Sequence, residues 1–435
     1  MRREPGLIRR GVLWLLLLGP LFFLSYGLAN SHTATLTDVG SLVFAWEHQV
    51  PLWPWTIIPY WSIDLLYGLS FLLPLTRREM DRHALALLTA QLICVACFVL
   101  WPLRFTFERP EIAGLFGWLF DVLMGFDKPF NQAPSLHIAL LVIVWTMFAR
   151  HTRTRFWRGL VHGWMALIGL SVLSTWQHHF VDVPTGALVG LLCVWLWPRD
   201  GHLPLHQARL ASDPRRWRLA LRYGLGATVC AVLAFTLASG WLWLWWPATS
   251  LLLVALNYAL IGARGFQKGE NGRLSMAATW LLGPYLIAAW LNSRLWTRRH
   301  PQADEVCHGV FLGRIPVHGE AAGFAAIVDL CAELPCARNA AQAYRSLPTL
   351  DLVVPEADLC RRAAEAIETL RQQGPLLVCC ALGYSRSASA VAAWLVVTGR
   401  CTDAAQAEAL IRQARPGVVL HPAHRRVLEH LEAQP

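Results

Sequence analysis

The sequence predicts a polytopic α-helical membrane domain with eight or nine transmembrane helices, followed by a C-terminal α/β domain. Of the 435 residues, 55% are hydrophobic and only 15% are charged, which is too apolar for an ordinary soluble protein. The apolar runs fill residues 12–293, whereas residues 300–435 contain Arg, Asp, Glu and Gln at the frequencies of soluble proteins. We therefore expect a membrane domain at residues 1–200, additional helices with a linker at 201–299, and the α/β domain at 300–435.

Nine apolar segments come close to the roughly 20 residues that a bilayer-spanning helix needs. They lie at residues 12–29, 54–74, 84–101, 135–149, 159–175, 182–197, 223–239, 242–261 and 275–292. The last segment contains Gly283-Pro284, and it is expected either to cross the membrane or to lie at its surface. The first reading gives nine spans and the second gives eight.

The placement of arginine predicts the orientation of these helices. Around the first six helices, basic residues concentrate in alternate loops, while the opposite loops hold only Arg104, Arg109 and Lys128. The positive-inside rule then places the N-terminus in the cytoplasm. The loops on the outer face are residues 30–53, 102–134 and 176–181.

The side of the C-terminal domain depends on whether eight or nine helices span the membrane. Arg298 and Arg299 follow the last helix, and seven cysteines that an oxidising compartment would threaten lie beyond it, so the cytoplasm is favoured. The short-looped polytopic architecture suggests an integral protein of a bacterial inner membrane.

The formal charge of +10, from 38 Lys and Arg against 28 Asp and Glu, does not indicate a nucleic-acid partner. The arginines cluster at the ends of apolar segments, without a basic stripe interleaved with aromatic residues. Eleven cysteines without regular spacing argue against a disulfide framework or a zinc site. We predict no metal and no cofactor, and expect the bilayer as a partner.

Polar residues on the predicted outer face have the composition of a phosphoryl-transfer site. His178 would attack phosphorus, Asp182 would orient its imidazole, and His137 would protonate the leaving oxygen. Arg104 and Arg109 would neutralise the phosphoryl oxygens. Ionisable groups near lipid are costly, which favours a functional role. The alternative is interfacial anchoring.

Residues 50–200 resemble the type 2 phosphatidic acid phosphatase (PAP2) superfamily. The run Pro134-Ser135-Leu136-His137 matches its Pro-Ser-Gly-His motif except at Leu136. His178 and Asp182 match the histidine and aspartate of its third motif. The resemblance implies that Ser135 binds phosphate.

Two positions depart from the PAP2 pattern. Val172 stands where the third motif has Arg, and Pro102 stands where the first motif has Lys. Either Arg104 and Arg109 take over the phosphate contacts, or the site accepts a substrate with less charge. The His-His-Phe-Val-Asp form is similar to sphingolipid and inositol-phosphorylceramide synthases, so head-group transfer is an alternative. A non-catalytic lipid-binding site is a further one.

A sharper motif lies in the C-terminal domain, where an apolar strand leads through a tight loop into an Ala-rich helix. The strand ends at Cys380, and a helix that opens at the loop directs backbone N–H groups and its dipole at one point. Cys380 would be a thiolate nucleophile there, and Arg386 would clamp the phosphoryl oxygens. Gly383 permits the turn, Ser387 would stabilise the departing thiolate, and Asp351 would swing over the loop as the general acid.

Residues 306–430 resemble the dual-specificity branch of the protein tyrosine phosphatase superfamily. The likeness is carried by Gly309 to Arg314, Ile327 to Leu330, Leu347 to Asp351, the Cys380 loop and Arg415-Pro416. One departure is Cys379, which stands where the family usually has His. Its spacing to Arg386 and the alternation of a strand exclude it as nucleophile. It is either a small buried apolar residue or a redox partner of Cys380.

Together these features predict a membrane-bound tandem phosphatase that acts on phosphomonoesters through a phosphocysteine intermediate, with a second PAP2-like site. Because the α/β domain is tethered at the bilayer, lipid phosphates are enriched as substrates. The alternative is a phosphoprotein phosphatase for phosphorylated Tyr, Ser or Thr. Its membrane half would be a head-group transferase or a non-catalytic lipid-binding anchor.

Overall fold

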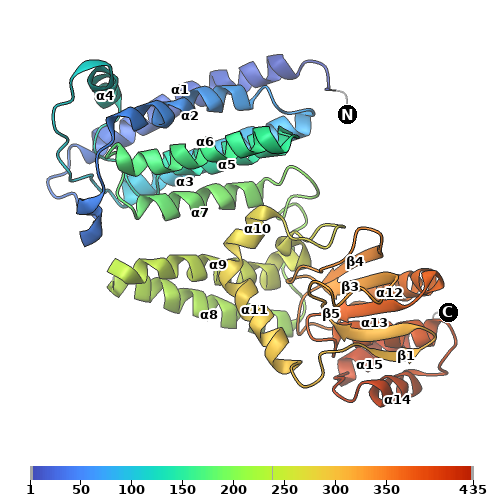
Figure 1. Ribbon diagram of the computed structural model, residues 1–435. Helices are drawn as coiled ribbons and strands as arrows, with labels where there is room; N and C mark the ends of the chain where they lie inside the picture. Colours follow the sequence, from blue (N-terminus) through green and yellow to red (C-terminus); the bar gives the residue numbers. More distant parts are fainter. Residues whose placement is uncertain (1–2, 238, 433–435) are drawn as a thin grey trace. The chain divides into compact units, whose positions relative to one another are not determined.

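The computed structural model describes residues 3–237 and 239–432, and the chain forms two compact units (Figure 1). The first unit is Met1–Leu203 with Leu237–Leu242, and the second is Pro204–Thr236 with Trp243–Pro435. The second unit therefore combines apolar helices with the α/β domain.

The first unit is built from helices. They are α1 (Leu7–Thr33), α2 (Ile57–Ser70), α3 (Arg77–Leu100), α4 (Gly114–Phe126), α5 (Leu136–His151), α6 (Arg155–Ser174) and α7 (Asp182–Leu196), with 3₁₀ turns at Ala45–Gln49 and Pro54–Thr56. Helices α5 and α7 approach closely because α7 carries Gly186 and Gly190. A Cβ atom at these positions would lie 2.4 Å and 2.7 Å from the carbonyl oxygens of Ser135 and Ala139. This packing brings the start of α7 beside the start of α5.

Helix α4 corrects the sequence prediction, which treated residues 102–134 as one outer loop. Its 13 residues are apolar except for Asp121, and the helix is shorter than the roughly 20 residues that a spanning helix needs. A search for long apolar segments therefore passes over it. Leu115 and Trp118 on this helix are exposed.

Among the residues that the structure describes, five segments are long and apolar enough to cross a membrane. They are Leu7–Thr33, Arg77–Leu100, Arg155–Ser174, Pro214–Leu237 and Gly240–Phe266. The predicted spans near residues 54–74, 135–149 and 182–197 form helices of 14, 16 and 15 residues. The count of eight or nine spans remains a prediction.

The helices of the second unit are α8 (Pro214–Leu237), α9 (Trp245–Leu256), α10 (Met276–Leu281) and α11 (Gly283–Trp296). The predicted helix at 242–261 continues beyond α9 as a π turn, η4 (Asn257–Ile261), and a 3₁₀ turn, η5 (Gly262–Phe266). The predicted helix at 275–292 is divided into α10 and α11. Pro284 sits in the first turn of α11, where its missing N–H costs no hydrogen bond.

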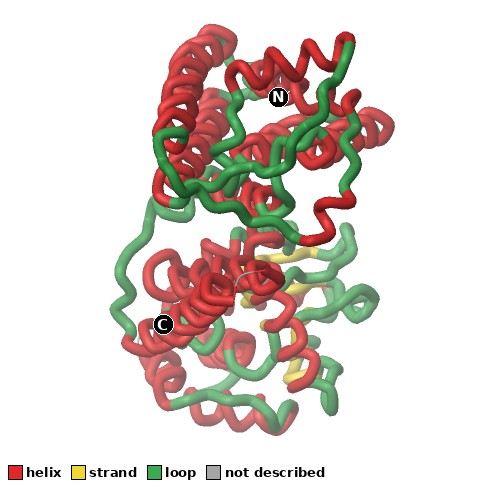
Figure 2. Tube along the Cα trace, turned by 90° about the vertical axis from the view of Figure 1, so that its left-hand side faces the viewer, coloured by secondary structure: helices red, strands yellow, loops and turns green. Residues whose placement is uncertain are grey.

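The α/β part contains a five-stranded sheet in the order β1-β2-β5-β3-β4. The strands are β1 (Asp304–Cys307), β2 (Val310–Arg314), β3 (Ala326–Cys331), β4 (Ala343–Thr349) and β5 (Leu376–Cys380). All neighbouring strands are parallel except β1 and β2. In Figure 2 the strands are the yellow segments, partly covered by helices and loops.

One face of the sheet packs against four helices in the main core of the α/β part. These are α12 (Ala357–Leu370), α13 (Arg386–Val397), α14 (Ala404–Ala414) and α15 (Pro422–Glu432) (Figure 1). A smaller cluster on the other face includes Leu377 and Ala321, with Ala289 of α11 packed against it. Helix α11 thus belongs to the packing of the sheet.

Lys268 ties the helical segment to the sheet. Its ammonium group is fully buried and lies 2.6 Å from the Asp329 carboxylate of β3. It also donates to the carbonyl oxygens of Cys331 and Leu334, both at 2.7 Å. The Asp329 carboxylate accepts a further hydrogen bond from Tyr344. A buried charge with this many partners fixes the position of the loop that carries it.

We predict that Lys268→Met destabilises the full chain by about 3 to 5 kcal/mol, because it leaves the buried Asp329 carboxylate without its cation. The measurement is thermal unfolding in detergent. Lys268→Met combined with Asp329→Asn should recover part of the loss, and the exposed Lys128→Met should unfold like the parent protein. A single Lys268→Met variant as stable as the parent would contradict the proposed role of the tie.

Candidate active site

The Cys380 loop joins the end of β5 to the start of α13. The Cys380 Sγ accepts hydrogen bonds from the Gly383 N–H and the Ser387 hydroxyl, both at 3.3 Å. Burial raises the pKa of this thiol, but the charge of Arg386 and these hydrogen bonds outweigh it and lower the pKa below its ordinary value. These contacts favour the thiolate form of Cys380.

Gly383 is required by the shape of the loop. Its φ is +77°, and a Cβ atom there would lie 2.4 Å from the carbonyl carbon of Gly313 on β2. The buried Arg415 guanidinium donates to the carbonyl oxygens of Gly383 and Leu382, at 3.1 Å and 3.4 Å. These contacts satisfy two carbonyl oxygens of the loop.

Arg386 is held by a buried ion pair that the sequence analysis did not include. Its Nη1 and Nη2 donate to the two carboxylate oxygens of Glu333, at 2.8 Å and 2.6 Å. Nη1 also donates to the Thr349 carbonyl oxygen at 2.8 Å. The buried Nε has no hydrogen-bond partner among the described residues. Glu333 thus fixes the guanidinium and leaves one N–H available for a phosphoryl oxygen.

Asp351 lies at the same site. Its carboxylate is 3.0 Å from Arg386 Nη2. Burial raises the pKa of Asp351 above its ordinary value; Arg386 lowers it, and the nearby Glu333 charge adds to the increase. The Tyr258 hydroxyl of η4 donates to the Asp351 carbonyl oxygen at 3.1 Å. This hydrogen bond attaches the backbone of Asp351 to the helical segment.

The geometry of the sheet explains why these residues meet. Cys380 is the last residue of β5, and Glu333 and Asp351 follow the carboxyl ends of β3 and β4. These three strands are neighbours in the sheet. Ligand sites of parallel sheets form at this edge. An acidic residue just after a buried strand was the signal that would have identified Glu333.

A cavity of about 400 Å³ adjoins the Cys380 loop. Its floor includes Glu333, Asp351, Ala381 and Leu382. The other walls come from α8, α9 and α11, through Tyr223, Pro247, Leu251, Pro284, Tyr285, Ala288, Ala289 and Asn292. The Ser293 hydroxyl of α11 donates to the Ala381 carbonyl oxygen at 2.5 Å, which holds this helix against the loop. Helices outside the α/β fold thus line the cavity beside the Cys380 loop.

Cys379 packs on the opposite face of the sheet from Cys380, as strand alternation predicted. It lies with Cys336 and Asp329 in a group whose potential ligand atoms are within 4.8 Å of one another. Burial raises the pKa of the Cys379 thiol well above its ordinary value, and Lys268 already neutralises Asp329.

The first unit brings three of the predicted site residues into a chain of hydrogen bonds. His178 Nε2 lies 3.1 Å from the Ser135 hydroxyl, and His178 Nδ1 lies 3.1 Å from the Asp182 carboxylate. All three side chains are buried. Asp182 also accepts from the His179 N–H at 2.9 Å. This arrangement orients the His178 imidazole and sets its tautomer.

The other predicted residues of the first unit lie around this chain without joining it. His137 stacks on Tyr60 at 4.3 Å between ring centroids, and its buried Nε2 has no partner among the described residues. Arg104 and Arg109 line one cavity of about 420 Å³ together with Trp176 and Gln177. Arg109 Nη2 donates to the Thr175 and Trp176 carbonyl oxygens at 3.0 Å and 3.1 Å.

Comparison with known proteins identifies the C-terminal part. Residues 310–434 match the family model described as dual specificity phosphatase, catalytic domain. No curated protein matches the chain significantly.

Solved structures similar to the chain include Tk-PTP in its active form, with 26% identity, 31% of this chain and 99% of that chain covered, and a TM-score of 0.29. Human DUSP28 has 23% identity, with 30% and 95% covered and a TM-score of 0.28. PTPMT1 in complex with PI(5)P has 19% identity, with 30% and 95% covered and a TM-score of 0.28. The family match contains the Cys380 loop, so residues 310–434 are a dual-specificity phosphatase catalytic domain and the chain is a phosphoric monoester hydrolase.

Proposed function

We propose that the chain is a membrane-embedded phosphatase that hydrolyses lipid phosphomonoesters at Cys380. The observation that carries this proposal is the cavity beside the Cys380 loop, whose walls come from α8, α9 and α11. Helix α8 and the segment that contains α9 are long and apolar enough to cross a membrane. A substrate that reaches Cys380 along these helices would come from the bilayer.

The surfaces of these helices support a lipid substrate. Helix α8 exposes Leu221, Leu225 and Phe235, and α11 exposes Ile287 and Leu295. Contiguous apolar side chains of this kind are normal in contact with lipid and costly in contact with water. A phosphoprotein is the alternative substrate, and a helix-enclosed site does not favour it. We place the Cys380 domain on the cytoplasmic side.

The reaction follows from the geometry of the loop. The Cys380 thiolate attacks phosphorus, the bond between phosphorus and the ester oxygen breaks, and Asp351 gives its proton to the leaving alkoxide. Arg386 binds the phosphoryl oxygens through its available Nε–H. Water then attacks the phosphocysteine while Asp351 takes a proton from it. Ser387 stabilises the departing thiolate, and inorganic phosphate is released.

A second proposed activity belongs to the first unit. The hydrogen-bonded chain Ser135–His178–Asp182 favours His178 as a nucleophile for phosphoryl or head-group transfer. Arg104 and Arg109 line a cavity that includes Gln177, the residue before His178, and are the cations available to an anionic substrate. A lipid-binding anchor without catalysis is the alternative.

A bulky side chain in the cavity beside the Cys380 loop should impair the hydrolysis of lipid phosphomonoesters without impairing the chemical steps at Cys380. Ala288→Trp should lower kcat/KM for a long-chain lipid phosphomonoester in mixed micelles by about 10-fold or more, because the indole occupies the space of the acyl glycerol part. Hydrolysis of a small soluble phosphomonoester should change little.

The matched control is Ile287→Trp, which adds the same ring on the exposed side of α11. Cys380→Ser gives the blank for both substrates. Equal losses on the two substrates in Ala288→Trp, or preferential hydrolysis of phosphopeptides by the parent protein, would contradict a lipid substrate.

The pH profile should depend on Asp351. Because Cys380 must be ionised, kcat/KM should rise as the pH passes the lowered pKa of its thiol. Because Asp351 must be protonated, kcat/KM should fall as the pH passes the raised pKa of its carboxyl group. Asp351→Asn should remove the alkaline decline and slow alkyl phosphates about 100-fold. The hydrolysis of aryl phosphates, whose leaving groups need no proton, should slow far less. Equal losses of rate on alkyl and aryl phosphates would mean that another residue is the general acid.

The second activity is tested in full-length Cys380→Ser protein. Any remaining phosphatase or transferase activity on phospholipids should disappear in His178→Ala, while the exposed His32→Ala should retain it. Arg104→Ala should weaken it by about 30-fold to 1000-fold, the effect of losing one charge-assisted phosphoryl contact. A Cys380→Ser protein inactive on every phospholipid, with or without an acceptor alcohol, would favour the lipid-binding anchor.

A further inference from the structure

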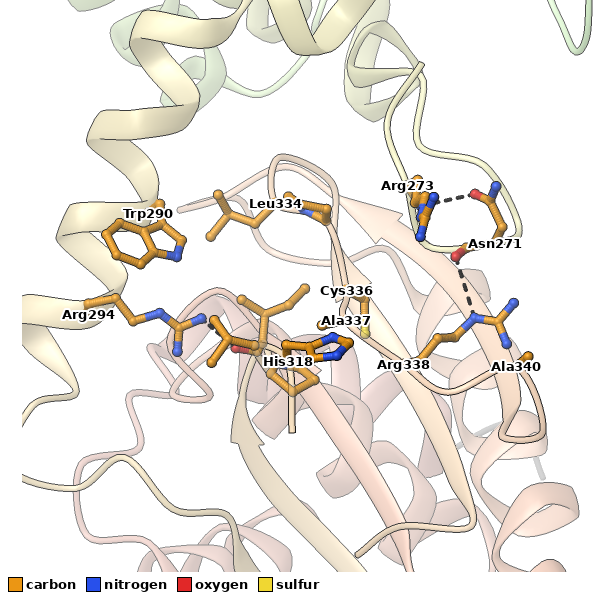
Figure 3. A pocket seen from close by; sticks show the side chains of 14 residues that line it. Asn271, Arg273, Trp290, Arg294, His318, Leu334, Cys336, Ala337, Arg338 and Ala340 are labelled. Carbon is orange, nitrogen blue, oxygen red and sulfur yellow. Dashed lines mark hydrogen bonds between the residues drawn. The ribbon is translucent and has the colours of Figure 1, made fainter. Parts of the chain in front are cut away.

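A second cavity, of about 530 Å³, lies beside the α/β sheet and shares no lining residue with the cavity at Cys380. Figure 3 shows its walls. Helix α11 contributes Trp290 and Arg294, and the loop before α10 contributes Asn271 and Arg273. The loops after β2 and β3 contribute His318 and Arg338 among others. No carboxylate lines this cavity.

Arg294 is the most informative residue in the cavity. Its Nη2 donates to the Ile315 carbonyl oxygen at 2.8 Å, which fixes the side chain (Figure 3). Its Nε and Nη1 are buried and have no hydrogen bond among the described residues. The nearest carboxylate oxygen belongs to Glu320 and lies 3.6 Å from Nη1. The Glu320 carboxylate also forms an ion pair with Arg314. These two nitrogens are shielded from solvent, so Arg294 contributes its positive charge to the cavity rather than a hydrogen-bonding surface.

The other two arginines add charge that described carboxylates do not neutralise. Arg338 donates to the carbonyl oxygens of Asn271 and Gln342, at 3.4 Å and 3.2 Å, and lies over the Tyr344 ring at 5.0 Å. These partners hold the guanidinium but leave its charge in place. Arg273 forms no ion pair with any residue that the structure describes, and its side chain borders the same space (Figure 3).

We propose that this cavity binds a phosphate group, supplied by the head group of an anionic phospholipid or by inorganic phosphate. Arginine is suited to this ligand because its planar guanidinium matches phosphate oxygens in a bidentate way. The half-exposed Trp290 at the wall, with exposed Leu291 and Leu295 on the same helix, suits a membrane interface. The proposal does not depend on the chemistry at Cys380.

The test measures binding to full-length Cys380→Ser protein in neutral detergent. The three ligands are phosphatidylglycerol, phosphatidylcholine with the same acyl chains, and inorganic phosphate. Phosphatidylglycerol is a phosphodiester and therefore not a phosphomonoester substrate. Phosphatidylglycerol should bind more tightly than phosphatidylcholine. The double variant Arg273→Gln with Arg338→Gln should weaken its binding about 10-fold or more. The control double variant Arg362→Gln with Arg412→Gln removes the same charge outside the cavity, and it should not weaken the binding of phosphatidylglycerol.

The source of the phosphate follows from competition. The free anion is a ligand if inorganic phosphate displaces phosphatidylglycerol and if the binding of inorganic phosphate weakens in the Arg273 and Arg338 double variant. The lipid head group is the ligand if inorganic phosphate does not displace phosphatidylglycerol and binds equally to the parent and to the double variant. Arg273→Gln alone carries the test if the double variant does not fold, because the Arg273 side chain forms no hydrogen bond among the described residues. Equal binding of phosphatidylglycerol to the parent and to the cavity variants would overturn the proposal.

Discussion

The catalytic geometry depends on the buried ion pair between Arg386 and Glu333. A guanidinium that is 1% exposed carries a large desolvation cost, and the two-pronged contact with Glu333 compensates for it in the absence of substrate. The same contact fixes the plane of the guanidinium, so its remaining N–H already has an orientation before a phosphoryl group arrives. The lowered pKa of Cys380 follows from this fixed charge, since Arg386 is the main group that opposes the effect of burial.

In the second unit, the apolar helices contact the catalytic domain close to this ion pair. Ser293 of α11 contacts the Cys380 loop, and Tyr258 of η4 contacts the backbone of Asp351. Lys268 joins the loop before α10 to the sheet through a buried ion pair. Three separate points of attachment, each close to a strand end, leave little freedom between these helices and the active site. The domain is therefore built into its helical surroundings rather than linked to them by a flexible tether.

The sequence was most informative where local pattern and chemistry coincide. A buried strand, a tight loop and an Ala-rich helix predicted the Cys380 site, and its assignment to a phosphoric monoester hydrolase is confirmed. Glu333 escaped because its role arises from the order of strands in the sheet, which joins residues distant in sequence. Helix α4 escaped because it is apolar but short. The PAP2 resemblance of residues 50–200 remains a prediction, although Ser135, His178 and Asp182 do meet.

The anchoring of Asp351 by Tyr258 has a consequence for the timing of catalysis. If this acid moved over the loop, as the sequence predicts, loop closure would be one step of every turnover. With its backbone held by η4, the acid stands at the site before substrate binds. An acid already held beside Arg386 would need no lid closure, a motion of microseconds to milliseconds, before it donates a proton.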